Sequence, residues 1–338
     1  MANRSYLVWF LSAVSLALLA VVAFNAIAER IILTHRAGPS IQTVSGFERV
    51  LKPAWLESIQ PDVVFVGSSR IRDAFDPVLL DPAFHIRAFN YGISSATDYE
   101  VRRLVQDAAA HPSVKEIVVS LDAFTANPAP GRTVSGFDEL RLAVGPNGKP
   151  TEQRPLWLFT SRYLSGGALG MHALALYLLA QLHTGEDAAA RPDIFEAYGH
   201  ATEAVLAHDL IYRGKRTFAM NSWEHTELRN TFAAVCHKPV RLVVFFPPDN
   251  ARIIDRYEAN DGPGLAVFKR TVIADARAHN ARCEGKIAVY DFMTANPITT
   301  SPMHNGQSDV YVDLVHVRPP VGVELYRMMR DPAGDLSR

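Results

Sequence analysis

The chain has 338 residues, with 34 Lys and Arg against 35 Asp and Glu and a formal net charge of -1 at pH 7. This balance, with both signs scattered along the chain, excludes the electrostatic footprint of a general nucleic-acid binder. Hydrophobic residues make up 48% of the chain and charged residues 20%, which is the composition of a folded protein of one large or two modest domains.

An uncharged, apolar segment at residues 6–28 is the first feature along the chain. At about 1.5 Å per residue it would form a helix of about 34 Å, which is long enough to cross a bilayer core. We predict a single-pass anchor in the cytoplasmic membrane, with residues 1–5 as a short cytoplasmic tail and the remaining chain periplasmic or otherwise extracytoplasmic. The alternative is a cleaved signal peptide with its exit at Ala26-Ile27-Ala28, although the apolar stretch is longer than a signal requires.

Residues 29–60 are predicted to form a connector and a first amphipathic helix, and residues 61–338 an α/β domain. Five short apolar runs in this domain are typical of strands buried on both faces of a parallel sheet. They lie at residues 62–67, 85–90, 116–121, 240–246 and 287–291, and helical stretches lie at about 97–111, 263–281 and 320–331. This alternation predicts a doubly wound, mostly parallel five-stranded sheet with helices on both faces and ligands at the carboxyl ends of the strands.

Residues from about 125 to 235 interrupt the alternation and are interpreted as a mainly helical insertion or cap. They include a second apolar stretch, Leu164 to Leu182, which carries His172. We interpret this stretch as a buried or membrane-facing cap helix, because a second membrane span would return the later strands to the other side of the bilayer.

Three polar side chains in this pattern can perform nucleophilic chemistry. Ser69 follows the first strand in the sequence Gly67-Ser68-Ser69, where a sharp turn can lift a serine above the sheet. Asp313 and His316 are three residues apart before the last helix, so the carboxylate can orient the imidazole as the base for the serine. The alternatives are an ordinary turn or phosphate nest at the serines, and a solvated aspartate beside a capping histidine.

These blocks together resemble the SGNH (GDSL-like) hydrolase superfamily, over about residues 60–125 and 238–330. Ser68 stands where many members have Asp, and Ser69 stands at the nucleophile position. The segment that begins Asn90-Tyr-Gly92 resembles the block whose glycine amide serves the oxyanion hole. The resemblance implies a flavodoxin-like three-layer sandwich, a catalytic triad of Ser69, Asp313 and His316, and an oxyanion hole formed by the amides of Ser69 and Gly92.

Asp122 departs from the superfamily pattern, which commonly has Gly-x-Asn-Asp after the third strand. Here the chain has Ser120-Leu-Asp122-Ala-Phe, so the usual side-chain oxyanion donor is missing. This segment and the serine at position 68 look more like the membrane-anchored branch that includes the D-alanine transfer protein of teichoic-acid modification and the alginate O-acetylation proteins. That resemblance implies acyl transfer to a cell-envelope or secreted polysaccharide beside a membrane-bound O-acyltransferase, without a cofactor.

Arg70, Asn90 and Asp122 are the candidate substrate-binding residues. An arginine fork suits a carboxylate or phosphate on a glycan, and Asp122 can bind a sugar hydroxyl. The alternatives are that Arg70 pairs with Asp73 or Asp76, and that Asp122 orients Arg70 or caps its strand. Pro247-Pro248-Asp249-Asn250 follows the fourth strand and is interpreted as a rigid turn beside the site.

The two cysteines each lie four residues before a predicted strand, Cys236 before the fourth and Cys283 before the fifth. If those strands are neighbours, the thiols reach matching heights at the amino end of the sheet, and a disulfide is geometrically reasonable. The alternative is two buried free thiols. The histidines show no HExxH pattern, and we predict no metal site.

The leading functional hypothesis is therefore an anchored, extracytoplasmic O-acyltransferase or acylesterase that acts on a polysaccharide, with acetyl as the expected acyl group. One alternative is a glycan-binding or assembly subunit that has lost turnover, and the missing Asn motivates it. Another is a lipase or esterase that acts on small or lipid esters.

Overall fold

The computed structural model describes residues 2–34, 48–124, 137–151, 218–284, 286–303 and 308–338, together with single positions between 159 and 176. Most of the predicted insertion at 125–235, including most of the stretch from Leu164 to Leu182, lies outside the described residues. The chain divides into two compact units: residues 1–36 with 151–191, and residues 37–150 with 192–338.

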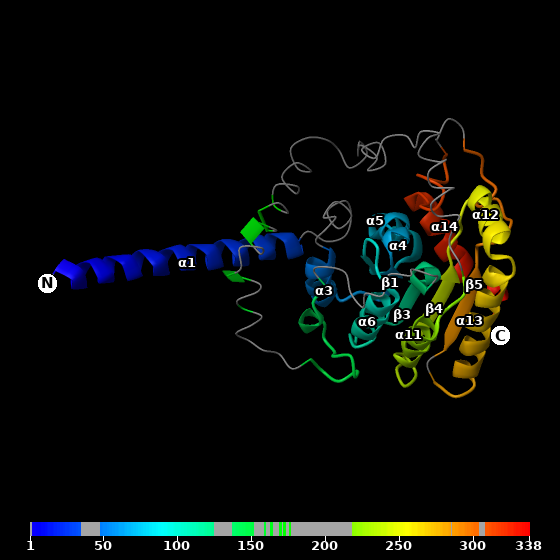
Figure 1. Ribbon diagram of the computed structural model, residues 1–338, viewed down its shortest axis with the longest axis horizontal. Helices are drawn as coiled ribbons and strands as arrows, with labels where there is room; N and C mark the ends of the chain where they lie inside the picture. Colours follow the sequence, from blue (N-terminus) through cyan, green and yellow to red (C-terminus); the bar gives the residue numbers. More distant parts are fainter. Residues whose placement is uncertain are drawn as a thin grey trace. The chain divides into compact units, whose positions relative to one another are not determined.

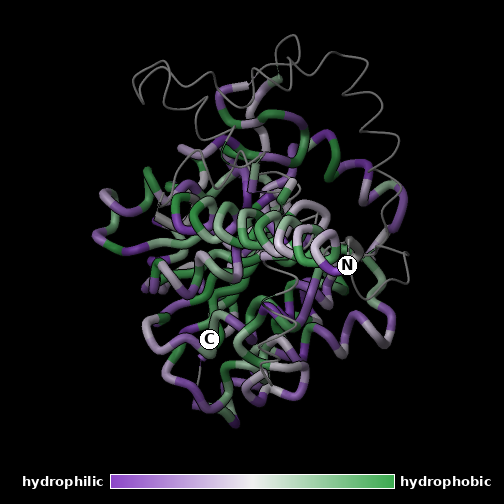
Figure 2. Tube along the Cα trace, turned by 90° about the vertical axis from the view of Figure 1, so that its left-hand side faces the viewer, coloured by the Kyte–Doolittle hydropathy of each residue, from purple (hydrophilic) through white to green (hydrophobic). Residues whose placement is uncertain are grey.

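The first unit is built on α1 (Ala2–Thr34), a helix that is long and apolar enough over Arg4–Ile31 to cross a membrane. Figure 2 shows hydrophobic residues along most of its turns. A polar residue, Asn25, interrupts this surface and is fully buried. Its amide donates to the carbonyl of Tyr163 at 2.7 Å, and its oxygen lies 3.0 Å from Nδ1 of His172. The apolar N-terminal helix predicted from residues 6–28 is thus present and extends beyond those bounds.

The second unit contains a five-stranded, all-parallel sheet with the order β2-β1-β3-β4-β5. Its strands are β1 (Val63–Gly67), β2 (Ala88–Gly92), β3 (Glu116–Ser120), β4 (Arg241–Phe246) and β5 (Ile287–Asp291). Nearly every strand residue is buried, as expected of a parallel sheet that helices cover on both faces. The predicted α/β class and the doubly wound parallel sheet are confirmed.

Helices form the two outer layers of this unit (Figure 1). One layer packs α6 (Asp98–Ala108), α11 (Ser222–Ala233) and α13 (Gly264–Asn280) side by side, with α12 (Ala251–Asp261) beside α13. The other layer packs α4 (Ser69–Ala74) and α5 (Pro77–Phe84) against α14 (Pro319–Met329). A further helix, α3 (Glu48–Ile59), packs at the β2 edge, and short 3-10 turns lie at η1 (Leu121–Phe124), η2 (Glu139–Arg141) and η4 (Pro332–Gly334).

The second strand begins later than the sequence predicts. Residue 85 was expected to start it, but His85 ends α5 in the left-handed conformation, with φ at 53°. The strand begins at Ala88, whose amide donates to the Asp81 side chain at 2.7 Å. Helix α5 is only eight residues long and contains Pro82. Its apolar pattern is too short to show where the helix ends and the strand begins.

The parallel register brings the carboxyl ends of the strands to one edge. Gly67 pairs with Gly92 across β1 and β2, and Ser120 pairs with Phe245 across β3 and β4. Gly92 is required at this edge, because a Cβ atom there would lie 2.3 Å from the backbone nitrogen of Arg72. This close approach sets the start of α4 directly over the end of β2.

Candidate active site

Two adjacent serines follow β1, and only the second is accessible. Ser68 is buried and caps α4, because its hydroxyl oxygen accepts a hydrogen bond from the Arg70 amide at 3.3 Å. The cap lets the chain pass from strand to helix within one residue. Ser69 is half-buried at the first position of α4, with its hydroxyl directed to another part of the chain.

The Ser69 hydroxyl lies 2.8 Å from Nε2 of His316, and Nδ1 of the same imidazole lies 2.7 Å from Oδ2 of Asp313. Ser69 and His316 are 247 positions apart in the sequence. A carboxylate at Nδ1 favours the tautomer that carries its proton there, which leaves the Nε2 lone pair facing the hydroxyl. The structure thus brings together the three predicted side chains in the order that activation of a serine requires.

A tight loop before α14 holds the acid and the base. Oδ1 of Asp313 accepts hydrogen bonds from the backbone amides of Val315 and His316, both at 2.7 Å. The Val312 amide donates to the His316 carbonyl at 2.9 Å, which closes the loop. These bonds fix the carboxylate through both of its oxygens, so Asp313 holds the imidazole in one orientation.

Asp122 faces the first serine rather than the second. One of its oxygens accepts a hydrogen bond from the Ser68 hydroxyl, and the other accepts one from the Ser120 hydroxyl at 2.5 Å. Nε of Arg70 lies 3.8 Å from the same carboxylate. These contacts match the structural alternative for Asp122, in which it orients Arg70, and the side chain is only 8% exposed.

Arg70 is buried and forms its main ion pair with Asp249, which is 179 residues further along the chain. The Tyr257 hydroxyl donates to the same carboxylate at 3.0 Å. Burial alone would lower the pKa of Arg70, but Asp249 and Asp122 raise it above its ordinary value. The alternative that Arg70 pairs with Asp73 or Asp76 is therefore wrong, and its contact with a glycan stays a prediction.

Asn90, the third predicted substrate-binding residue, is fully buried and occupied within the protein. Its side-chain amide donates to the carbonyls of Ile71, Arg72 and Phe75, at 2.9, 3.1 and 2.8 Å. It therefore closes the end of α4 against β2. Its contacts assign Asn90 a structural role in place of the predicted one.

The Gly92 amide also has a partner other than a substrate oxygen. It donates to Oδ1 of Asn90 at 2.9 Å, so the expectation that it serves an oxyanion hole is corrected. Ser95, three residues later, is exposed and has a left-handed backbone with φ at 51°. Among the residues that the structure describes, the backbone amides of Ser69 and Ser95 have no hydrogen-bond partner.

A buried lysine that the sequence did not single out supports this region. Lys52, from α3, is fully buried, and its ammonium donates to the Gly92 carbonyl at 2.5 Å and lies 3.4 Å from Oδ1 of Asn90. Burial lowers the pKa of Lys52 to about 7, against the opposing effect of Glu48. The apolar spacing of α3 predicts the helix, but it does not show that a lysine on it faces the protein interior.

The two cysteines lie at the opposite, amino end of the sheet. Cys236 and Cys283 are disulfide-bonded, with their Cα atoms 4.8 Å apart, and they precede the neighbouring strands β4 and β5. The disulfide predicted from the equal spacing of the two cysteines before their strands is therefore present in the structure.

Comparisons with protein-family models, with curated proteins and with solved structures find no match for this chain. The resemblance to the SGNH superfamily therefore depends on the sequence blocks alone. The geometry of Ser69, His316 and Asp313 stands independently of it.

Proposed function

We propose that this protein is a membrane-anchored, extracytoplasmic serine enzyme that transfers an acyl group, or removes one, on a cell-envelope or secreted polysaccharide. The observation that carries the proposal is the Ser69–His316–Asp313 relay, with contacts of 2.8 and 2.7 Å. The apolar α1 and the disulfide support the compartment, because disulfides persist in oxidising environments. The polysaccharide acceptor follows from the resemblance to the membrane-anchored acyl-transfer branch.

In the first half of the proposed reaction, the Ser69 hydroxyl attacks the acyl carbonyl while His316 takes its proton. Asp313 stabilises the imidazolium that forms. The backbone amide of Ser69, which donates to none of the described residues, is the proposed donor for the oxyanion. His316 then gives its proton to the leaving group, which departs and leaves the acyl group on Ser69.

In the second half, a hydroxyl of the acceptor enters and His316 removes its proton. The new alkoxide attacks the acyl-serine, and the collapse of the second tetrahedral intermediate returns the proton to Ser69. Water in place of the sugar hydroxyl gives hydrolysis. Acetyl is the proposed acyl group, and a membrane-bound O-acyltransferase is the proposed source of it.

The position of Asp122 favours a second candidate, a glycan-binding or assembly subunit without turnover. An ionised carboxylate near the nucleophile opposes a developing oxyanion, and loss of one donor can cost about 3 kcal/mol of transition-state stabilisation. The ion pair of Asp122 with Arg70 and its two serine hydrogen bonds reduce that repulsion. They make the catalytic proposal the stronger of the two.

Fluorophosphonate labelling of membranes that contain the full-length chain tests the proposal. We expect the probe to modify Ser69 in the wild-type protein and to fail with Ser69→Ala and His316→Ala. Ser113→Ala is the control, because the Ser113 hydroxyl forms no hydrogen bond with the described residues and lies in the turn before β3, outside the relay. Absence of label on folded wild-type protein favours the binding subunit, and a label on a different serine overturns the assignment.

Measuring how much of the acyl group goes to polysaccharide and how much to water distinguishes transfer from hydrolysis. With p-nitrophenyl acetate as the donor, we expect polysaccharide to increase the rate of p-nitrophenol release and to become acetylated. A preference for long-chain esters, without transfer to polysaccharide, would instead identify a lipase-type esterase.

A further inference from the structure

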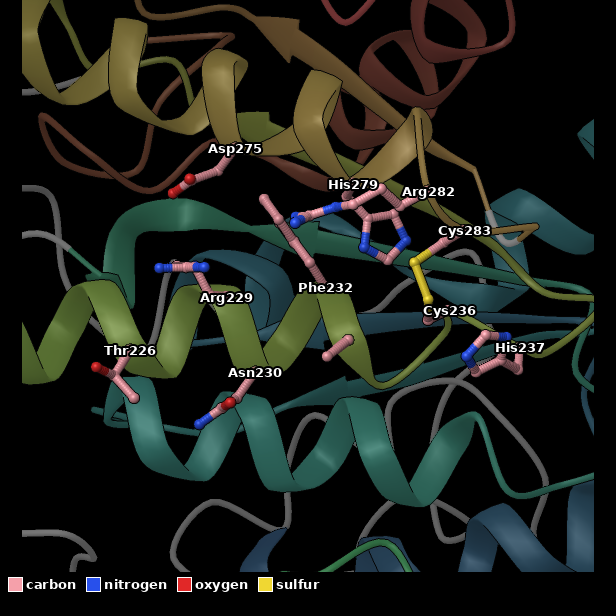
Figure 3. Close-up of a pocket in the computed structure, with 11 residues that line it drawn as sticks. Thr226, Arg229, Asn230, Phe232, Cys236, His237, Asp275, His279, Arg282 and Cys283 are labelled. Atoms are coloured by element: carbon pink, nitrogen blue, oxygen red, sulfur yellow. A yellow bond between two sulfur atoms is a disulfide. The ribbon is translucent and has the colours of Figure 1, made fainter.

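A pocket of about 560 Å³ lies between α11 and α13 (Figure 3). Because Cys236 and Cys283 line it, the pocket is at the amino end of the sheet, opposite the end that carries Ser69. The residues that line it include the following: Phe232, Cys236, His237, His279, Arg282 and Cys283. Of the described residues, only Cys236, His279 and Cys283 form a group of three or more whose ligand atoms converge in a way that suits a metal ion.

The three ligand atoms all lie within 4.8 Å of one another. His279 is in the last turn of α13, Cys283 follows the end of this helix, and the Cys283 amide donates to the His279 carbonyl at 2.9 Å. This hydrogen bond continues the helical pattern and keeps the two side chains on one side, and Cys236 approaches them from the turn after α11. Ligand atoms around a tetrahedral zinc ion are about 3.3 to 3.8 Å apart, so the group needs only side-chain rotation to fit once the sulfurs are separate.

Contacts other than the disulfide hold these residues in place. The Glu284 amide donates to the Cys236 carbonyl at 3.1 Å, and the Lys286 ammonium donates to the Cys283 carbonyl at 2.8 Å. The Phe232 ring packs edge-on against the His279 imidazole, with centroids 6.3 Å apart. The ligand set therefore remains together when the S–S bond is broken.

We propose that Cys236, Cys283 and His279 form a binding site for Zn²⁺ in the reduced protein, so that the disulfide and the metal complex are alternative states of one pocket. Two thiolates and an imidazole are ligands that zinc prefers, whereas magnesium and calcium prefer oxygen. The pocket is open to solvent beside the exposed His237, which leaves a fourth coordination position for water or for that side chain.

The two states interconvert by a balanced exchange. A dithiol reductant gives two electrons and two protons to the Cys236–Cys283 bond, which breaks to leave two thiols and a disulfide in the reductant. Zn²⁺ then binds the two sulfurs and displaces both thiol protons. A disulfide oxidant reverses the process, because it takes two electrons from the thiolates and the cation leaves as the S–S bond forms. A chain exported with reduced thiols thus takes up zinc before it is oxidised.

Cobalt binding to the full-length protein in detergent tests this site. After reduction with a phosphine and removal of the reductant under anaerobic conditions, we expect Co²⁺ to give a thiolate-to-cobalt charge-transfer band that saturates at a single ion per chain. The oxidised protein should give no band. His279→Gln should weaken binding by about tenfold or more, since it removes a metal ligand. The matched control is His225→Gln, on the neighbouring turns of α11, where His225 pairs with Asp275 at 2.6 Å.

A measurement on wild-type protein covers the case in which His279→Gln fails to fold. We expect Zn²⁺ to slow the alkylation of both Cys236 and Cys283 in the reduced chain, as read by mass spectrometry. The proposal is overturned if the reduced wild-type protein shows no charge-transfer band, if zinc leaves alkylation unchanged, or if folded His279→Gln binds cobalt as tightly as wild type. None of these readouts depends on acyl transfer.

Discussion

The backbone amide of Asn250 donates to the carbonyl of Leu314 at 2.8 Å, which joins the turn after β4 directly to the loop that carries Asp313 and His316. The preceding residue, Asp249, binds Arg70, which follows Ser69. Two consecutive residues therefore connect the nucleophile with the base. A shift of this turn would change the distance between Ser69 and His316.

The buried Arg70–Asp249 pair gives the first prediction. Asp249→Leu leaves a guanidinium buried without its main partner, and we expect the free energy of unfolding to fall by about 3–5 kcal/mol. Arg70→Met combined with Asp249→Leu removes both charges and should recover much of this loss. Urea denaturation of the single and double variants measures the coupling. Additive losses would show that the two charges do not interact.

The second prediction concerns Asp313. Asp313→Asn weakens the preference for the proton on Nδ1 of His316, so Nε2 loses its role as acceptor for the Ser69 proton. We expect fluorophosphonate labelling to slow by about 10³-fold to 10⁴-fold with the fold unchanged. Asp309→Asn is the control, because Asp309 is an exposed acid four residues earlier. Equal labelling by wild type and Asp313→Asn would remove Asp313 from the triad.

Lys52 gives a prediction about pH. Its pKa is lowered to about 7 in the folded chain, whereas an unfolded lysine keeps its proton to about pH 10.4. Between these two pH values the unfolded chain binds more protons than the folded chain. The contribution of Lys52 therefore makes the free energy of unfolding rise with pH, by up to about 1.4 kcal/mol per pH unit. This gain in stability is lost as the pH falls to 7.

Lys52→Met isolates that contribution from those of other titrating groups. Between about pH 7.5 and 9.5, we expect the unfolding free energy of wild type minus that of Lys52→Met to increase with pH. Chemical denaturation across this range measures the difference. A difference that is constant with pH would mean that Lys52 titrates alike in the folded and unfolded chains.

Gly92 and Ser95 give opposite predictions for small substitutions in one turn. Gly92→Ala would place its Cβ 2.3 Å from the Arg72 nitrogen, so we expect a loss of about 1–3 kcal/mol or more and slower labelling of Ser69. Ser95→Gly relieves a left-handed non-glycine residue and should stabilise the fold by about 1 kcal/mol. Thermal unfolding of both variants checks this, and a harmless Gly92→Ala would contradict the close approach.

The N-terminal helix gives the last prediction. We expect the mature protein to keep residue 1 or 2 at its N-terminus and to resist extraction from membranes by alkaline carbonate, because α1 can cross a bilayer. Mass spectrometry of the purified protein reads the terminus. A mature chain that begins after Ala28 would identify a signal peptide instead.

The sequence predicts the parallel sheet well, because each of its five strands is a short, β-branched or aromatic apolar run next to a helical stretch. It predicts Ser69, Asp313 and His316 because their residue types and positions at strand ends suit one reaction. It does not predict the partner of Arg70: Asp249 is 179 residues away, while Asp73 and Asp76 are nearby acids. Local spacing carries no information about which distant loop reaches a buried charge.

The sequence also does not predict the structural roles of Asn90 and Gly92. Their positions at the carboxyl end of β2 agree with the prediction, but an amide side chain can either bind a ligand or close a helix. The choice depends on α4 crossing the end of β2, which brings three carbonyls within reach of Asn90.

The bond between Ser68 and Asp122 has a consequence for protein engineering, because a hydroxyl and an acid occupy two buried positions in direct contact. Replacing Ser68 by Asp alone would set two carboxylates against each other, and replacing Asp122 by Asn alone would remove the acid that faces Arg70. The two positions are therefore coupled, and a redesign that changes one at a time would pass through a less stable variant.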